Sequence, residues 1–283
     1  MSEADAGSGF DPAWLDLREP VDHRSRSEEL ARMLARHFGR RASTSVLDLG
    51  CGTGSNLRAT APLLGPEQDW SLVDNDEALL EAAIVRLSAW ASSAERNGTC
   101  LTLTKGGKRI RVRFLCADLA RDLDWVLEPG ADLYTASALF DLVSDDFIVD
   151  MTAEVARRRA AFFTVLTYNG LQRWTPRHEA DAALGSAFRS HQGRDKGFGP
   201  AAGPIAPALL AAAFDAAGYA VSEGDSAWRL GAGDEPLIEA LAAGYAAAVG
   251  ETRLVPEAKI AHWRAAGRTA ALVGHTDTLA LPV

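Results

Sequence analysis

One short stretch constrains the fold more than any other part of the chain. It is VLDLGCGTGSN, residues 46–56, in which one acidic residue and three glycines occupy alternate positions. An apolar run that ends in a glycine-rich turn is typical of the first strand and loop of a nucleotide-binding α/β domain. The spacing of the glycines then decides which ligands fit.

That spacing disfavours two common ligand classes. A dinucleotide loop requires G-x-G-x-x-G, and Ser55 stands where the third glycine would follow Gly50 and Gly52. A triphosphate loop requires GxxxxGK followed by Ser or Thr, and no lysine lies near this loop. The spacing therefore argues against both a dinucleotide site and a triphosphate site.

The rest of the chain predicts an α/β fold. From about Ser45 onward, short apolar runs alternate with longer amphipathic segments, which is the pattern of a parallel sheet with helices on both faces. Strands are expected in SVLDLG, WSLVD, the second arm of a hairpin around Gly106 and Gly107, ADLYTASALFDLV, AAFFTVLTYNG, YAVSEGDSAWRL and TAALVGHTDTLALP. Helices are expected between them, one of them beginning after Ser144 as N-cap.

The chain also predicts additions to this core. Residues 1–40 are expected to form a tail and a lid helix that begins near Ser25, and residues 41–283 the main domain. The segment 170–203 is irregular and rich in Gly, Pro, His and charge. Such a length is unusual for a simple connection and indicates an active-site insertion. With the two helices expected at 235–266, it is predicted to form a substrate cap.

Composition narrows the class of protein. The chain has 283 residues, of which 47% are hydrophobic and 24% charged, and a formal net charge of −9. A negative surface repels phosphate backbones, so no long nucleic acid is expected as a partner. Three cysteines without CxxC spacing favour neither a disulfide framework nor a metal site. With no secretory signal or membrane-length apolar run, a cytoplasmic protein without membrane contact is expected.

The arrangement D-x-G-x-G-x-G, formed by Asp48, Gly50, Gly52 and Gly54, resembles that of class I S-adenosylmethionine-dependent methyltransferases. The resemblance extends from about Val46 to Tyr168. It implies a Rossmann-like, doubly wound, mostly parallel seven-stranded sheet with helical cap additions. It also implies S-adenosylmethionine as cofactor and S-adenosylhomocysteine as its product.

The resemblance assigns cofactor roles residue by residue. Asp74, at the end of WSLVD, would accept the ribose hydroxyls, and Asp118 would hold the adenine amino group. Asp48 would orient the loop and meet the methionine ammonium, or only tie down the turn, and Asn75 would contact the adenine edge or serve only in the turn. The predicted cofactor-binding set is Asp48, Gly50, Cys51, Gly52, Gly54, Asn56, Asp74, Asn75, Asp118, Leu119 and Ser137.

The methyl acceptor is expected beyond the ends of the fourth and fifth strands, because ligands of open α/β sheets bind there. The predicted catalytic residues are Asp141, Tyr168 and His191, and the predicted substrate-binding residues are Arg18, Phe140 and Asn169. Four of them also have a simpler interpretation: Asp141 as a helix-start acid, Tyr168 as a packing residue, His191 as a loop histidine and Arg18 as part of a surface ion pair. His178, His262 and His275 are less favoured, because nothing in their sequence setting points to this edge of the sheet.

These patterns predict methyl transfer to a small metabolite by in-line displacement. The fourth strand ends in SALFDLV and lacks both the D/N-P-P-Y/F of base amino methylation and the Pro-Cys pair of cytosine carbon methylation. The alternatives are a methyltransferase for proteins or tRNA, and a non-catalytic module that binds S-adenosylmethionine. The expected partner is a small-molecule acceptor, and the expected state is a monomer or homodimer.

Overall fold

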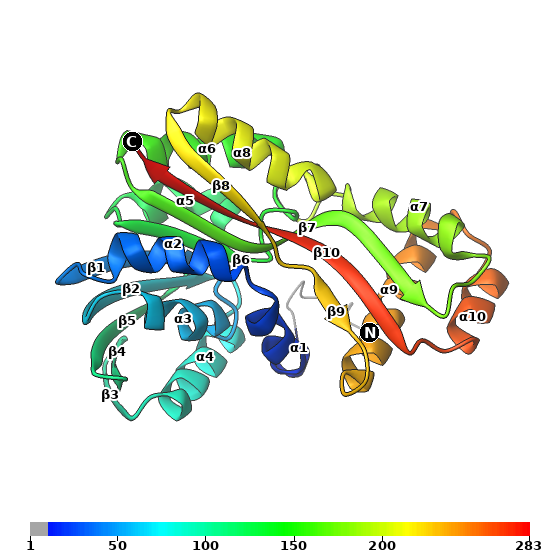
Figure 1. Cartoon of the computed structure of the whole chain (residues 1–283), viewed down its shortest axis with the longest axis horizontal. Helices are drawn as coiled ribbons and strands as arrows, with labels where there is room; N and C mark the ends of the chain where they lie inside the picture. The colour runs from blue at the N-terminus through cyan, green and yellow to red at the C-terminus, as the bar shows by residue number, and fades with distance from the viewer. Residues whose placement is uncertain (1–10) are drawn as a thin grey trace, which may run out of the picture.

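The alternating segments fold into one twisted sheet with helices on both faces, and a helical extension lies at one end (Figure 1). The computed structural model describes residues 11–283. Residues 1–10, the start of the predicted tail, lie outside this range. No helix between residues 11 and 283 combines the length and apolarity that crossing a bilayer requires.

The described residues contain one ten-stranded sheet in the order β3-β4-β5-β2-β1-β6-β7-β10-β8, with β9 paired to β10. Strands β5, β2, β1, β6 and β7 run parallel, and β10 runs antiparallel to β7 and β8. The strands are β1 (Ser43–Leu49), β2 (Glu67–Asp74), β3 (Ser93–Asn97), β4 (Cys100–Lys105), β5 (Lys108–Cys116), β6 (Leu133–Ser137), β7 (Ala161–Thr175), β8 (Tyr219–Asp225), β9 (Trp228–Leu230) and β10 (Ala270–Pro282).

The predicted fold class is confirmed by the seven core strands β5-β2-β1-β6-β7-β10-β8. The hairpin arms β3 and β4 and the short β9 are additions to that core. The predicted sixth strand is split at Ser226 and Ala227 into β8 and β9, both of which pair with β10. The order reverses beside β1, between β2 and β6, which is where open α/β sheets place their ligands.

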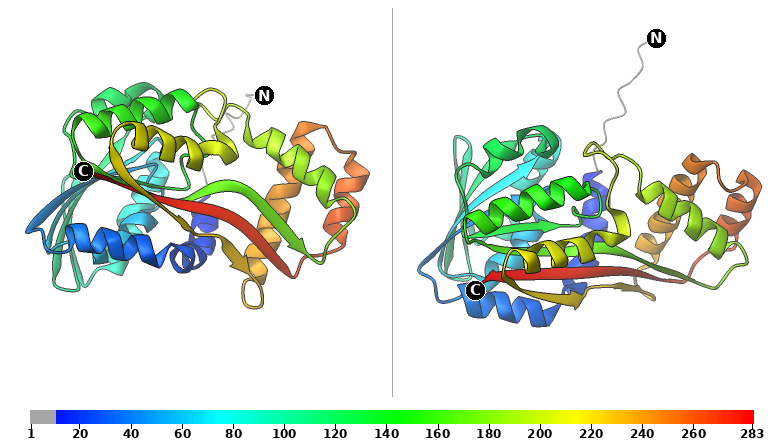
Figure 2. Two further views of the ribbon diagram at one scale, coloured as in Figure 1. Left: turned by 45° about the horizontal axis from the view of Figure 1, so that its top comes forward. Right: turned by 90° about the horizontal axis from the view of Figure 1, so that it is seen from above.

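Helices α2, α3 and α4 cover one face of the sheet, and α5, α6 and α8 cover the other (Figures 1 and 2). Two clusters of buried side chains fill these layers, one including Leu34, Phe38 and Leu57 and the other including Met151 and Phe214. The helices are α1 (Pro12–Ser25), α2 (Glu28–Phe38), α3 (Ser55–Thr60), α4 (Glu77–Trp90), α5 (Leu119–Leu127), α6 (Asp145–Arg157), α7 (Asp181–Gln192), α8 (Ala206–Ala216), α9 (Glu235–Thr252) and α10 (Glu257–Ala265), with 3₁₀ turns η1 (Ala61–Leu63) and η2 (Gly203–Ile205).

The N-terminal segment contains two helices, so the prediction of a single helix from about Ser25 was wrong. Asp11 caps α1 by accepting a hydrogen bond from the Ala13 amide at 2.9 Å. A proline is favourable in the first turn, because the first amides have no helical partner, and Pro12 stands there. The chain becomes extended at Arg26 and Ser27, and Ser27 then caps α2.

The hairpin around Gly106 and Gly107 is confirmed, because β4 and β5 pair antiparallel with Lys105 opposite Lys108. Strand β3 adds an arm that the sequence did not predict. All five of its residues are exposed, so the strand carries no apolar alternation that marks it in the sequence.

The helical extension is built on two long strands. The outer arms of β7 and β10 pair from Thr175 opposite Ala270 inward to Tyr168 opposite His275, and α7, α9 and α10 lie beside them (Figure 2). We call these outer arms and three helices the cap. The prediction that 170–203 is irregular was wrong for residues 170–175, which continue β7, and for α7.

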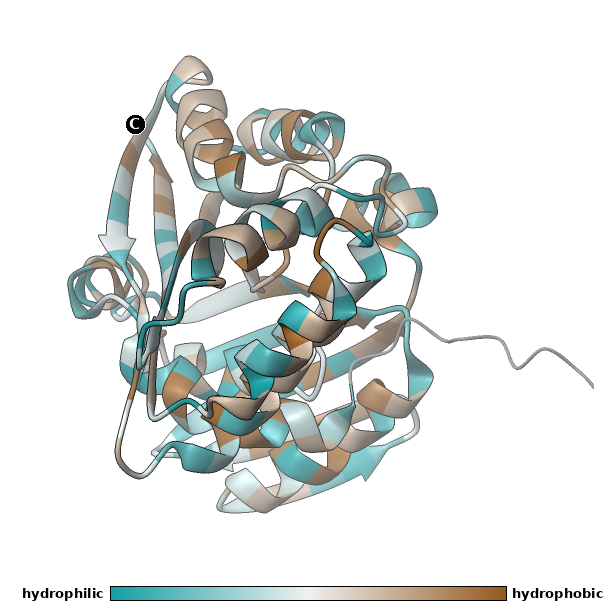
Figure 3. Cartoon of the chain, turned by 90° about the vertical axis from the view of Figure 1, so that its right-hand side faces the viewer, coloured by the Kyte–Doolittle hydropathy of each residue, from teal (hydrophilic) through white to brown (hydrophobic). Residues whose placement is uncertain are grey.

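Aromatic side chains hold the cap together. The Trp174 ring lies 5.4 Å from the Tyr245 ring and 5.2 Å from the Trp263 ring. The indole nitrogen of Trp263 donates to Asp181 Oδ1 at 2.7 Å. Figure 3 faces the cap and shows hydrophobic and hydrophilic stretches mixed along its helices, as expected for helices that bury one side. The aromatic core of the cap therefore belongs to the same hydrophobic cluster as one face of the sheet.

Candidate functional site

The glycine loop leaves β1 through a left-handed backbone. Gly50 has φ +62° and Gly52 has φ +51°, a region that side chains with a Cβ disfavour. A Cβ on Gly50 would lie 3.2 Å from Leu139 Cδ1, and one on Gly52 would lie 3.2 Å from Leu15 Cδ1. The glycines therefore form the turn and let α1 and the segment after β6 approach it.

Asp74 links this loop to the end of β2. Its Oδ2 accepts a hydrogen bond from the Gly52 amide at 2.8 Å, and its Oδ1 accepts one from the Asp76 amide at 3.1 Å. A carboxylate has about four acceptor positions, so two remain for a ligand. The side chain lines a cavity although the residue is only 8% exposed, and this burial raises the pKa of its carboxyl group.

Asp48 lies behind the loop and is fully buried. Its Oδ1 accepts a hydrogen bond from Asn56 Nδ2 at 2.7 Å, whereas its Oδ2 has no partner among residues 11–283. Burial is the main reason why the pKa of Asp48 is raised to about 7. Asn56 also donates to Thr135 and accepts from Arg26, so its amide groups are engaged within the protein.

A cavity of about 890 Å³ runs along the carboxyl ends of the strands, from the glycine loop to the cap. Its size lies within the range of roughly 300 to 1,000 Å³ found for small-molecule and cofactor sites. The loop compartment of this cavity is formed by Gly50, Cys51, Gly52, Asp74, Asn75, Asp118, Leu119 and Ser137. The cap compartment is formed by Arg18, Asp22, Asp141, Leu166, Tyr168, Gln172, Phe188, Trp228, Tyr245 and His275.

The cavity brings together most of the residues that the sequence singled out. Those that line it are Arg18, Gly50, Cys51, Gly52, Asn56, Asp74, Asn75, Asp118, Leu119, Ser137, Asp141 and Tyr168. Those that do not are Asp48, Gly54, Phe140, Asn169 and His191. Lining a cavity places a residue without fixing its role, so the roles assigned from the sequence stay predictions.

Three of the residues outside the lining have other partners. Phe140 is fully buried, and its ring lies 5.2 Å from the Phe162 ring in the sheet core. Asn169 donates from Nδ2 to Thr276 Oγ1 at 3.2 Å and so joins β7 to β10. His191 Nε2 lies 2.9 Å from a carboxylate oxygen of Glu251, which ties α7 to α9. The geometry thus gives these three side chains packing and bridging contacts.

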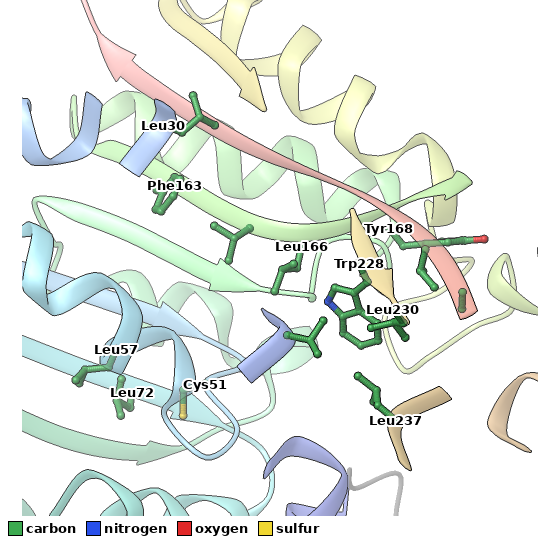
Figure 4. Close-up of a cluster of buried hydrophobic side chains, with 14 of the residues drawn as sticks. Leu30, Cys51, Leu57, Leu72, Phe163, Leu166, Tyr168, Trp228, Leu230 and Leu237 are labelled. Atoms are coloured by element: carbon green, nitrogen blue, oxygen red, sulfur yellow. The ribbon is translucent and has the colours of Figure 1, made fainter. Parts of the chain in front are cut away.

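Arg18 enters the cap compartment from α1 but already holds a carboxylate. Its Nε donates to Asp22 Oδ2 at 2.8 Å, and its guanidinium lies 5.0 Å from the Trp228 ring centre. The Trp228 indole nitrogen donates to Asp22 Oδ1 at 3.0 Å. Figure 4 shows this indole between Leu166 and Leu230. The three side chains fix α1 against β9, and the charge of Arg18 is balanced within the protein.

Asp141 and Tyr168 meet where β7 passes the segment after β6. The Tyr168 amide donates to Asp141 Oδ1 at 3.3 Å. Burial raises the pKa of Asp141 to about 6 and that of Tyr168 to about 12. At neutral pH the tyrosine therefore stays protonated, and the aspartate is a carboxylate that can accept a proton.

His275 belongs to the same wall, although the sequence disfavoured it. It stands opposite Tyr168 on β10, and its ring lies 5.2 Å from the Trp228 ring. Its Nδ1 is buried without a partner in the described part of the chain. Burial, with a smaller contribution from Arg18, lowers its pKa to about 3, so the imidazole is neutral. His275 reaches the cavity only because β10 pairs with β7. No local sequence pattern predicts that pairing.

A buried carboxylate holds this wall in shape. Asp277, fully buried on β10, accepts hydrogen bonds from the Leu166 amide and from the Ser27 amide, each at 2.8 Å. Leu166 has φ +58°, a strained value for a branched side chain. The hydrogen bond that Asp277 accepts from Leu166 supports the left-handed backbone at this cavity-lining residue. The hydrogen bond that it accepts from Ser27 fixes the start of α2.

The cavity lining is acidic. Among the described residues that line it there are six aspartates and two basic side chains, Arg18 and Lys196. A concave surface of one sign raises the local concentration of ligands of the opposite sign. No group of three or more His, Cys, Asp or Glu side chains within residues 11–283 is arranged to hold a metal ion. The arrangement favours cationic organic ligands.

Comparisons with known proteins agree with the fold. No family model and no curated protein matches the sequence. A cyclopropane-fatty-acyl-phospholipid synthase-like protein from Lactobacillus casei is similar in structure, with 16% identity, a TM-score of 0.55, and coverage of 96% of this chain and 94% of that one. A putative methyltransferase from Bacillus halodurans shares 12% identity over 89% of this chain and 99% of that one, with a TM-score of 0.48.

At such low identity the likeness concerns the fold alone. Together with the strand order, it shows that the chain has the fold of class I S-adenosylmethionine-dependent methyltransferases.

Proposed function

We propose that the protein is an S-adenosylmethionine-dependent methyltransferase that acts on a small molecule by in-line displacement. One observation carries the proposal. The glycine loop and Asp74 line the same cavity as the side chains of the cap compartment. Two ligands held in adjoining compartments are what a transfer between them requires.

The loop compartment fits the cofactor. Asp74 has acceptor positions left for the ribose hydroxyls, and charged hydrogen bonds of this kind are among the stronger ones. Asp118 lines the same compartment while its Oδ1 caps α5 by accepting from the Ala120 amide at 3.0 Å. The acidic lining suits a ligand with ammonium and sulfonium charges. When bound, S-adenosylmethionine supplies a methyl group already activated by its sulfonium.

The cap compartment provides the remaining functions. Its walls hold an acceptor beside the loop compartment, and such alignment is worth up to about 7 to 11 kcal/mol in favourable model reactions. Asp141 is the group we assign to accept the proton of the acceptor, because it is an ionised, buried carboxylate on the cavity wall. The Tyr168 amide fixes its orientation.

The shape of the cap favours a small molecule over a protein or tRNA group. Buried aromatic rings of Tyr168, Trp228 and Tyr245 line the compartment, and α1 crosses the cavity through Trp14, Leu15 and Arg18. A macromolecule would have to displace these elements. The cytoplasmic location and the monomeric or dimeric state stay predictions.

The proposal is tested by incubating the protein with methyl-labelled S-adenosylmethionine and a metabolite extract freed of macromolecules. A labelled small molecule, lost in the Asp141→Asn variant, is expected. A protein that binds the cofactor but labels nothing would be a binding module. Label that appears only in added protein or RNA would favour the macromolecular alternative.

A further inference from the structure

Asp141 forms no ion pair in the cap compartment, and the charge of Arg18, which acts on it, is already paired with Asp22. The Tyr168 amide donates to it, and no ion pair to Asp141 occurs within residues 11–283. Asp22, in the same compartment, is by contrast paired with Arg18. A buried carboxylate without a cationic partner is costly, and a cationic ligand would remove that cost.

Two further groups in this compartment lack hydrogen-bond partners. Gln172 Oε1 and His275 Nδ1 are both buried and unpartnered in the described part of the chain. The amide oxygen is an acceptor, and a neutral imidazole offers one acceptor nitrogen. With Asp141, residues that carry acceptors line the compartment from the segment after β6, from β7 and from β10. The two unpartnered atoms are closed off from solvent, so a ligand with N–H groups reaches them once their side chains rotate.

Aromatic rings form the remaining walls. The Phe188 ring lies 6.1 Å from the Tyr168 ring and 4.7 Å from the Tyr245 ring, and the Trp228 ring lies 5.2 Å from the His275 ring. Rings of this kind accommodate flat apolar groups, and their faces attract cations.

The two basic side chains of the lining offset this acceptor surface only in part. Arg18 is bound to Asp22, and Lys196 is partly exposed next to Asp195 in the segment after α7. The buried part of the compartment therefore carries surplus negative charge and hydrogen-bond acceptors.

We propose that the cap compartment binds a small amine with a flat apolar group, its ammonium against Asp141 and its N–H groups toward Gln172 and His275. This inference rests on the proposed function, because the compartment adjoins the loop compartment. A carboxylate ligand would meet Asp141 with like charge, and an alcohol would leave Asp141 without an ion pair.

Methyl transfer to the nitrogen of such an ammonium releases one proton. The ammonium gives a proton to the Asp141 carboxylate, the freed lone pair forms the new carbon–nitrogen bond, and the carbon–sulfur bond breaks with its electron pair remaining on sulfur. The products are the methylated amine, S-adenosylhomocysteine and a proton that passes from Asp141 to solvent.

The test is calorimetric and does not depend on turnover. The protein is saturated with S-adenosylhomocysteine and titrated with benzylamine, 2-phenylethylamine and tryptamine, and with the alcohol and carboxylate of each skeleton. At least one amine is expected to bind, and at least ten-fold more tightly than its alcohol and carboxylate counterparts. Binding of no amine, or equal or tighter binding of an alcohol or carboxylate, would overturn the inference.

Matched variants connect the result to the site. Asp141→Asn keeps an acceptor for the Tyr168 amide and should weaken amine binding at least ten-fold with S-adenosylhomocysteine binding unchanged. Gln172→Met should weaken amine binding as well, whereas Asp150→Asn, an exposed residue of α6, should not. Unchanged amine affinity in Asp141→Asn would contradict the assignment. Failure of the wild type to bind S-adenosylhomocysteine would instead count against the proposed function.

Discussion

The buried carboxylate of Asp48 gives a prediction whose size follows from the structure. It is fully buried, one of its oxygens has no partner within residues 11–283, and burial raises its pKa from 3.8 to about 7. Asp48→Asn keeps the shape of the side chain and an oxygen to accept from Asn56, but removes the charge. We expect the variant to be more stable than the wild type at alkaline pH.

The magnitude follows from linkage between protonation and folding. A raised acid pKa means that the folded state binds more protons than the unfolded state between pH 4 and 7, so the wild type loses stability as pH rises through that window. At about 1.4 kcal/mol per pKa unit, the ionised Asp48 carboxylate destabilises the folded state by on the order of 4 kcal/mol at pH 8. At pH 5.5 the same relation gives a destabilisation by Asp48 that is about 2 kcal/mol smaller than at pH 8.

The measurement is urea denaturation of both proteins at pH 5.5 and pH 8. The stability gain of Asp48→Asn should be about 2 kcal/mol larger at pH 8. His275, whose lowered pKa destabilises the fold as pH falls below 6.5, has the same effect in both proteins and cancels in the difference. Asp150→Asn, which removes an exposed carboxylate, serves as control. A gain that is the same at both pH values would refute the reasoning.

Three further predictions concern the loop compartment. Asp74→Ala removes charged hydrogen bonds worth about 1.5 to 3 kcal/mol, so calorimetry should show a Kd for S-adenosylmethionine about 10 to 150 times higher, and an unchanged Kd would exclude the assigned role. Gly52→Ala should lower unfolding stability by about 1 to 2 kcal/mol through its left-handed backbone and its approach to Leu15; equal urea midpoints would contradict this. In iodoacetamide labelling followed by mass spectrometry, the exposed Cys116 should react before the buried Cys51, whose thiol pKa is raised by burial; the reverse order would show that the loop opens.

The parts of the site that could be predicted are those encoded locally. The glycine loop follows β1 directly in the sequence, and Asp74 closes β2, the next strand along the chain. Because parallel neighbours end at the same edge of a sheet, the chain order already places these residues together. The same argument placed Asp141 and Tyr168 near the cavity, although β7 does not end at Tyr168 as the sequence indicated but continues to Thr175.

The parts that could not be predicted depend on contacts between distant segments. His275 reaches the cavity only because β10 inserts antiparallel between β7 and β8, and Arg18 is occupied because α1 places Asp22 beside Trp228. His191 lies on a regular helix and is held by Glu251, since the outer arm of β7 gives α7 a surface on which to pack. Gly185 inside that helix and the absence of a capping side chain at its start concealed it in the sequence.

The central claim concerns the ligand of the glycine loop, and its most direct test is titration calorimetry of the wild-type protein with S-adenosylmethionine and, separately, with a nicotinamide dinucleotide. The account predicts saturable binding of S-adenosylmethionine at one site per chain and no measurable binding of the dinucleotide. Tight binding of the dinucleotide without binding of S-adenosylmethionine would contradict it.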